Sequence, residues 1–368
     1  MSLPTSPDTP VLPQRPAGKA YFPCEYKDEI DQMHNLADSL FEHYSDTIID
    51  KGITDGVQEY YVPRKPEEPL TQLPFMAGRG HVPDLTPLEV FTGIRITSYR
   101  MMWDVRIQAA VTVRIFSQHD FTFYLVWRGI GPIYSPRDVV GRQGLRAYDA
   151  AGRLQTTPDF DTQRITVCYT SVPSLPGIPD QAEGCVRAKI LEGGYIIEAN
   201  PTLGGCDVTY FAKVDLALTI PSWISTHLVG ETRRCVGRLR DALKTFGVPP
   251  ILMDRQQCVA LQFLEHHPES RRVTVLVTII HPGTFYLYLD YGKMYTQGIV
   301  ATNIEGEAAA CIRLREEVAT REDEGVLGEG RRRLAVDVLH EGIGGDVRIT
   351  LDATDKKEPE SGTGPGWW

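Results

Sequence analysis

The sequence lacks the features that mark membrane-spanning, secreted and nucleic-acid-binding proteins. No apolar run reaches the roughly 18 residues of a transmembrane helix, and prolines interrupt the N-terminus where a signal peptide would be apolar. The 38 lysines and arginines form no basic block and are outnumbered by 48 acidic residues, which argues against nucleic acid as a partner. The seven cysteines include no C-x-x-C pair. We therefore expect reduced thiols in a cytoplasmic protein that is at most peripheral at membranes.

Signatures of the common catalytic and metal sites are absent too. The sequence contains neither G-x-S-x-G nor a cysteine and histidine string of the nucleophilic hydrolases. Its histidines have no zinc-like spacing, and "GVLGEGRRR" lacks the lysine and hydroxyl of a phosphate loop. We therefore predict no catalytic residue, no metal site, no cofactor and a protein that is not an enzyme.

The composition divides the chain into two folded regions between two tails. Residues 1–19 carry a proline at every third position from Pro4, and residues 356–368 read "KKEPESGTGPGWW". Both segments have too few apolar residues to offset the entropy of ordering, so we predict disordered tails. Between them, Pro249-Pro250 separates a first domain at residues 20–250 from a second at residues 251–355.

The first domain mixes helical and strand patterns. Apolar residues at spacings of three and four predict an amphipathic helix between Tyr26 and Asp50. Strand patterns follow, and Gly193-Gly194 and Gly204-Gly205 predict two tight turns that separate three antiparallel strands. An apolar stripe between Ser222 and Phe246 then predicts one long closing helix. These elements indicate an α+β domain in which a curved antiparallel sheet grips a helix.

The second domain has only strand patterns. Seven short apolar runs, from "CVALQFLEHH" to "DVRITLDA", are separated by turn residues and by the charged loop "REDEGVLGEGRRR". Short strands at this spacing are typical of an all-β sandwich. We expect this acidic domain to bind a protein partner.

Four strings in the first domain resemble one known family. They are "MWD" at residues 102–104, "SPRDVV" at 135–140, "SVPSLPG" followed by "GCVRA" at 184–188, and "VTYFAKVDLALTIPSW" at 208–223, which runs into the last helix. Their order and spacing between Tyr26 and Pro250 are similar to those of the START domain, the steroidogenic acute regulatory protein-related lipid transfer family. The resemblance does not reach the second domain.

The resemblance implies a helix-grip fold and a lipid-binding function. In this fold the sheet curves around the last helix and leaves a tunnel that holds one hydrophobic ligand, here a sterol, phospholipid or acyl lipid. The helix between Ser222 and Phe246 and the loop "VPSLPGIPDQAEG" would act as a lid, which predicts transient membrane contact. Two alternatives are a helix-grip enzyme of the polyketide cyclase or aromatase type and a regulatory scaffold without ligand.

The expected ligand contacts lie on the strands and on the apolar stripe of the last helix. They are Trp103, Tyr124, Val126, Arg137, Gln143, Tyr169, Tyr210, Ile224, Leu228, Cys235 and Leu239. Sterol-binding START domains pair a buried arginine with a glutamate. In this sequence Gln143 aligns with the arginine and Tyr124 with the glutamate, so the resemblance implies neutral groups at these positions. An alignment shifted by one residue would place Arg142 at the arginine position instead. Two structural alternatives remain open: Arg137-Asp138 as a pair that fixes the turn, and Trp103 as a core residue.

Overall fold

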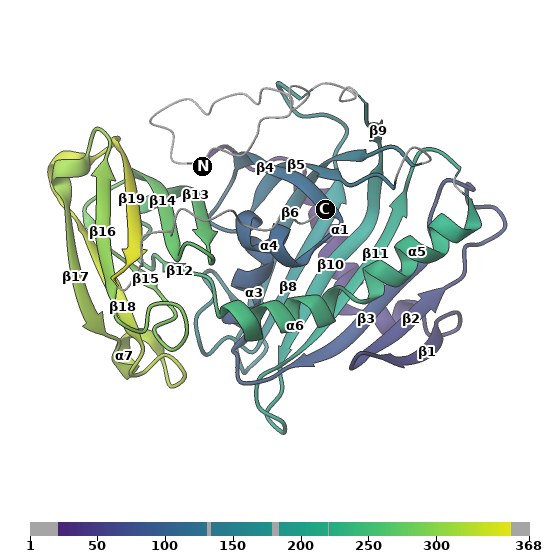
Figure 1. Cartoon of the computed structure of the whole chain (residues 1–368), viewed down its shortest axis with the longest axis horizontal. Helices are drawn as coiled ribbons and strands as arrows, with labels where there is room; N and C mark the ends of the chain where they lie inside the picture. The colour runs from purple at the N-terminus through teal and green to yellow at the C-terminus, as the bar shows by residue number, and fades with distance from the viewer. Residues whose placement is uncertain (1–20, 131–133, 179–183, 220, 355–368) are drawn as a thin grey trace, which may run out of the picture.

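One large antiparallel sheet forms the body of the first domain (Figure 1). In the computed structural model, which describes residues 21–130, 134–178, 184–219 and 221–354, the sheet has 11 strands. Nine follow one another in the order β1-β2-β3-β11-β10-β8-β6-β5-β4, while β7 and β9 both pair with β6. The strands are β1 (Ile49–Thr54), β2 (Val57–Val62), β3 (Phe75–Val82), β4 (Ile107–Ile115), β5 (Phe121–Trp127), β6 (Arg137–Tyr148), β7 (Leu154–Gln155), β8 (Arg164–Ser171), β9 (Val186–Arg187), β10 (Lys189–Ala199) and β11 (Cys206–Asp215). The tails predicted at residues 1–19 and 356–368 lie outside the described residues.

Helices cover both faces of this sheet (Figure 1). On the outer face, Ile30 and Ala37 of α1 pack in a cluster with Cys168, Ile196 and Phe211. On the inner face, the last two helices of the domain cross the sheet, next to two short helices (Figure 1). The helices are α1 (Lys27–Asp38), α2 (Leu40–His43), α3 (Pro87–Arg95), α4 (Thr97–Trp103), α5 (Ser222–Arg233) and α6 (Cys235–Phe246). In the described part of the chain, no helix combines the length and apolarity needed to span a membrane.

Two of three local sequence expectations require correction. The helix expected between Tyr26 and Asp50 ends early, because the residues after α2 extend into β1, which pairs with β2. The turn expected at Gly193-Gly194 is wrong: both residues lie inside β10. A Cβ atom on Gly194 would lie 2.6 Å from the carbonyl oxygen of Val167, so this glycine permits a close approach within the sheet. The turn predicted at Gly204-Gly205 is confirmed, with φ angles of +74° and +71°.

The C-terminal region contains two four-stranded sheets. Their orders are β12-β15-β18-β17 and β13-β14-β19-β16. The seven predicted strands are all present, together with the short β12 that directly follows the first domain. The elements are β12 (Ile251–Met253), β13 (Val259–His267), β14 (Arg272–Ile279), β15 (Gly283–Tyr288), β16 (Ile299–Glu305), η1 (Ala309–Cys311), β17 (Ile312–Val318), α7 (Arg321–Glu324), β18 (Arg332–Val338), η2 (His340–Gly342) and β19 (Asp346–Ala353).

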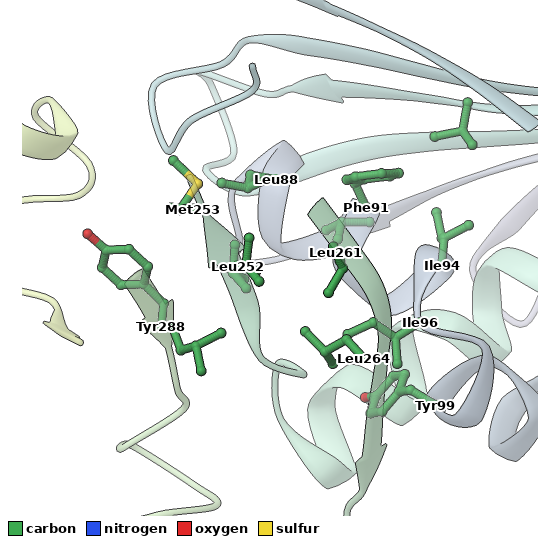
Figure 2. Close-up of a cluster of buried hydrophobic side chains, with 14 of the residues drawn as sticks. Leu88, Phe91, Ile94, Ile96, Tyr99, Leu252, Met253, Leu261, Leu264 and Tyr288 are labelled. Atoms are coloured by element: carbon green, nitrogen blue, oxygen red, sulfur yellow. The ribbon is translucent and has the colours of Figure 1, made fainter. Parts of the chain in front are cut away.

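A continuous hydrophobic core joins this β domain to α3 and α4. Figure 2 shows that side chains of these two helices meet side chains of β12 and β13. The labelled residues are Leu88, Phe91, Ile94, Ile96, Tyr99, Leu252, Met253, Leu261, Leu264 and Tyr288. Polar contacts surround this core: the Gln118 amide donates to the carbonyl oxygen of Leu252 at 2.6 Å, and the backbone N–H of His266 donates to Ser98 Oγ at 2.9 Å.

We expect the two domains to unfold together, because separating them would expose this core. Replacing Ile96 with valine removes one buried methylene at the interface and should lower the free energy of unfolding by about 0.5–1.5 kcal/mol. Calorimetry should show one transition that moves as a whole to lower temperature. Two transitions, of which only one moves, would contradict a shared core.

Candidate functional site

The inner face of the sheet encloses a cavity with two chambers. The α4 chamber has a volume of about 70 Å³ and lies between α3, α4 and the strands β4, β5, β6, β8, β10 and β11. The α5 chamber has a volume of about 190 Å³ and lies between α5, β11 and the residues after β5. The two chambers share five lining residues: Arg106, Trp127, Tyr210, Ala212 and Val214. These five residues form a common wall, so the two chambers lie side by side under the last helices.

Strand β5 presents one alternating set of side chains to the α4 chamber. Phe121, Phe123, Leu125 and Trp127 line it, whereas the expected contacts Tyr124 and Val126 point to the other face. There the phenol ring of Tyr124 packs in a cluster with Val140, Val172, Leu175 and Ile178. Both faces of the strand are thus covered by apolar groups, which is why the alternation of the sequence does not reveal the face that lines the cavity.

Three other expected residues do line the cavity. Gln143 of β6 and Tyr169 of β8 line the α4 chamber, and Tyr210 of β11 lines both chambers. The Gln143 amide donates to the backbone oxygen of His119 at 3.1 Å. The alternative residue Arg142 points elsewhere, because its guanidinium donates to the backbone oxygen of Glu25.

The last helices contribute less than expected. Leu228 of α5 lines the α5 chamber. Ile224, Cys235 and Leu239 are fully buried, but they pack in hydrophobic clusters and line neither chamber. The apolar stripe that predicted the helix therefore serves mainly to attach it to the sheet.

Trp103 and Arg137 also occupy structural positions. The indole Nε1 of Trp103 donates to the carbonyl oxygen of Gly93 at 3.1 Å, which joins α4 to α3. The Arg137 guanidinium lies 3.9 Å from the ring centre of Tyr134 and donates to the carbonyl oxygens of Ser135 and Leu216. Neither side chain lines a chamber.

Asp138 does not pair with its neighbour Arg137. Its buried carboxylate accepts two hydrogen bonds from Arg187 of β9, at 3.0 and 2.8 Å. The charges of "SPRDVV" thus fix the entrance of β6 through two separate sets of contacts.

Two arginines that sequence reasoning missed line the α4 chamber. Arg100 in α4 and Arg106 before β4 flank Asp104, whose carboxylate is fully buried. Arg106 donates to both carboxylate oxygens at 2.8 Å, and Arg100 Nη2 lies 3.7 Å from one of them. Burial alone would raise the pKa of Asp104, but Arg106 and Arg100 outweigh it and hold the pKa at about 2. Two cations therefore share one anion, which leaves one positive charge at the chamber wall.

Tyrosines surround the guanidinium of Arg100. Its Nη1 donates to the hydroxyl oxygen of Tyr169 at 3.1 Å, and it lies 5.2 Å and 5.8 Å from the ring centres of Tyr169 and Tyr195. Burial raises the pKa of Tyr169 to about 12, so the phenol is neutral at physiological pH. Buried atoms without a hydrogen-bond partner in the described structure include Arg100 Nε and the Tyr195 hydroxyl. Of these two residues, Arg100 lines the chamber, so an unused donor lies on a guanidinium next to excess positive charge.

The arginines were visible in the sequence, since "YRMMWDVR" places them four residues before and two residues after Asp104. An arginine four residues before an aspartate on a helix lies on the same side of it. No pattern in the sequence, however, shows that this side faces a cavity. The aspartate of "MWD" thus acts as the counter-ion of both guanidinium groups.

Comparison with known proteins identifies the family. Residues 58–238 match the family model of the START domain. These residues are therefore a START domain, with a START-type fold in a chain of mixed α+β structure, and the C-terminal β sheets lie outside the match. No curated protein matches the chain.

Solved structures similar to this chain include two human proteins and one bacterial enzyme. Human StAR-related lipid transfer protein 5 is 18% identical, with a TM-score of 0.47, over 60% of this chain and 99% of that one. Human STARD10 is 16% identical, also with a TM-score of 0.47, over 61% of this chain and 82% of that one. The Zhui aromatase/cyclase from Streptomyces sp. R1128 is 9% identical, with a TM-score of 0.29, over 46% of this chain and 90% of that one.

Proposed function

We propose that this protein binds and carries one amphiphile with an anionic group, such as a fatty acid, without changing it chemically. The START domain indicates lipid binding as the general activity. The observation that supports an anionic ligand is the arginine pair on Asp104: Arg100, Arg106 and Arg95 line the α4 chamber, and no described lining residue of that chamber is acidic.

The excess charge would favour a carboxylate or phosphate over a hydroxyl. Hydrogen bonds to charged groups stabilise a complex by about 1.5–3 kcal/mol, roughly twice the value for neutral pairs. The side chains of Arg100 and Arg106 are only 17% and 15% exposed, so little solvent screening would weaken them. The arginines thus take the place of the neutral groups of Gln143 and Tyr124 that the sequence predicted at the ligand.

The size of the cavity favours a ligand with one acyl chain or one fused-ring skeleton. A dry protein cavity of about 150 Å³ holds a benzene molecule. The chambers of about 70 and 190 Å³ are somewhat larger in total, which fits a single chain better than the two chains of a phospholipid. The apolar walls of β5 and β11 would cover that chain, at about 25 cal/mol per Å² of apolar surface buried.

Access to the cavity would involve α5 and transient contact with a membrane. Trp223 at the start of α5 and Leu218 before it are 55% and 53% exposed, and Val105 on the α5 chamber is 50% exposed. Large apolar side chains beside a cavity mouth are suited to brief insertion among lipid headgroups. Of the proposed lid loop, residues 179–183 lie outside the described structure. A protein partner of the β domain and a cytoplasmic location stay predictions.

A second candidate function is a helix-grip cyclase or aromatase. The observation that favours it is the group formed by Arg100, Tyr169 and Tyr195, because buried cations and neutral phenols stabilise a developing enolate. An enzyme would release a product that differs in mass from the compound it received. A carrier would return the compound unchanged.

Native mass spectrometry of the full-length protein, followed by extraction of the ligand, tests the proposal. We expect a one-to-one complex with an acidic amphiphile after exposure to a mixed lipid extract. Replacing Ala212, which lines both chambers, with leucine should reduce bound lipid at least about tenfold, because the added atoms fill the junction.

The matched control is Ala77→Leu. Ala77 is equally buried, but it packs in the cluster under α1 on the outer face of the same sheet. Ala77→Leu should cost about 1–3 kcal/mol of stability through overpacking, whereas the atoms added at Ala212 enter free space; only Ala212→Leu should remove the lipid. Equal lipid loss in both variants, or a protein that stays empty with every lipid class, would contradict a ligand at this cavity.

A further inference from the structure

The closing helix consists of two halves that belong to different hydrophobic clusters. The helix expected between Ser222 and Phe246 is divided at Arg234, where α5 ends and α6 begins, although backbone hydrogen bonds from Arg234 to Gly230 and from Arg238 to Arg234 still join the two halves. Buried side chains of α6, including Leu239 and Leu243, are part of the main core that continues into the β domain. Those of α5 pack instead in a small separate cluster with Leu73, Met76, Tyr134, Val214 and Leu216. The packing of α6 is therefore coupled to the β domain, and that of α5 is not.

The loop after β15 of the β domain holds the end of α6. The Lys293 ammonium donates to the carbonyl oxygens of Leu243 and Lys244 at 3.3 and 3.1 Å, where a cation also complements the helix dipole. The Asp290 carboxylate accepts a hydrogen bond from the backbone N–H of Val248 at 2.9 Å. We call Asp290 and Lys293 the clamp.

A third contact fixes the same end of α6 from the START side. The Tyr99 hydroxyl in α4 donates to the carbonyl oxygen of Gly247 at 2.8 Å. Since α4 itself packs against β13, this contact also depends on the position of the β domain.

The interruption between the two halves is fixed to the sheet. Arg106 donates to Thr232 Oγ1 at 3.0 Å on the α5 side and contacts Cys235 Sγ at 2.8 Å on the α6 side. Gly78 of β3 faces the carbonyl oxygen of Arg233, which would lie 2.2 Å from a Cβ atom at that position. The backbone of the helix thus meets the backbone of the sheet at this point, which suits a pivot.

Beyond the pivot, α5 forms a wall of the cavity. His227, Leu228, Glu231 and Thr232 line the α5 chamber. The first turn of α5 has no side-chain cap, and its Trp223 is exposed. Movement of α5 alone would therefore open the α5 chamber while α6 stays in place.

We propose that the β domain serves as a fixed anchor for α6, so that only α5 acts as the lid and turns about Arg234. The purpose of the opening rests on the proposed lipid carrier. The division of the helix into an anchored and a mobile half does not depend on any ligand. It gives the β domain a mechanical role within the chain, independent of a protein partner.

Hydrogen exchange of the full-length protein without added lipid tests this division. We expect the amides of α5 to exchange at least about tenfold faster than those of α6, because local opening of α5 disrupts the small cluster and the polar contacts of Glu231, Thr232 and Arg233 but leaves the main core intact. Replacing Lys293 with methionine, which keeps the aliphatic stem, should speed exchange in the last turn of α6 by about three- to tenfold and leave α5 unchanged.

The control is Lys244→Met, since Lys244 lies on the exposed side of the same turn and its side chain does not contact the clamp. It should alter neither half. Asp290→Asn is a second clamp variant and should act like Lys293→Met. Equal exchange of α5 and α6 in the unmodified protein, or clamp variants that change both halves alike, would overturn the anchor. The lipid proposal is unaffected by these outcomes, because it is judged by the extracted ligand.

Discussion

Replacing Asp104 with asparagine is expected to lower the free energy of unfolding by about 3–5 kcal/mol, because it leaves two largely buried guanidinium groups without their counter-ion. The side chains have nearly the same shape, so the loss reports on charge and not on volume. Urea unfolding near neutral pH measures it. Asp241→Asn is the control: its carboxylate is 67% exposed and pairs with Arg240 at the surface, so the loss there should be under about 1 kcal/mol.

The cost of Asp104→Asn should depend on pH. The carboxyl has a pKa of about 2 in the folded protein and 3.8 when unperturbed. Because the folded pKa is depressed, ionised Asp104 stabilises the fold above about pH 4 and loses this effect as the pH falls toward 2. The depressed pKa of Asp104 contributes about 2 kcal/mol to the free energy of unfolding at neutral pH. Roughly half of this contribution should be lost between about pH 6 and about pH 3. A difference between the two proteins that stays constant over this range would contradict the buried ion cluster.

Replacing Arg100 with glutamine is expected to remove the preference for an acidic ligand. A fatty acid and the fatty alcohol of equal chain length differ only in the group that would meet the arginines. The unmodified protein should bind the acid about ten- to a hundredfold more tightly, and Arg100→Gln should bring the two affinities close together by weakening the acid alone. Titration calorimetry with both ligands measures the ratio.

Arg146→Gln is the control for this experiment. Arg146 is similarly shielded, but it pairs with Asp31 of α1 at 2.9 Å on the outer face of the sheet. It should leave the ratio of the two affinities unchanged. If the unmodified protein binds acid and alcohol equally, the arginines serve the fold alone.

The sequence predicted the architecture better than the site. The four START strings and the strand spacing identified the sheet, the closing helix and the β domain. They did not predict the interruption at Arg234, because the apolar stripe continues through it from Ile224 to Leu243. The interruption depends on contacts with Gly78 and Arg106, which are remote in sequence.

The cavity residues were harder to predict because exposure to water did not distinguish the two faces of the strands. On β5, the loop that carries Val172 and Leu175 covers the face of Tyr124, so an apolar alternation fits either choice. The charged residues of the cavity were missed because charged side chains are usually exposed at the surface. Arg100 and Arg106 look like surface residues in sequence, and only the fold brings them to Asp104 and the cavity.

The continuous core between the domains has a practical consequence for work on the lipid site. A chain cut at Pro250 would leave Leu88, Phe91 and Ile96 on a bare apolar surface, since their partners in β12 and β13 would be gone. Surfaces of this kind promote self-association. The proposed lipid site of this chain should therefore be purified, labelled and titrated only with its C-terminal sheets attached.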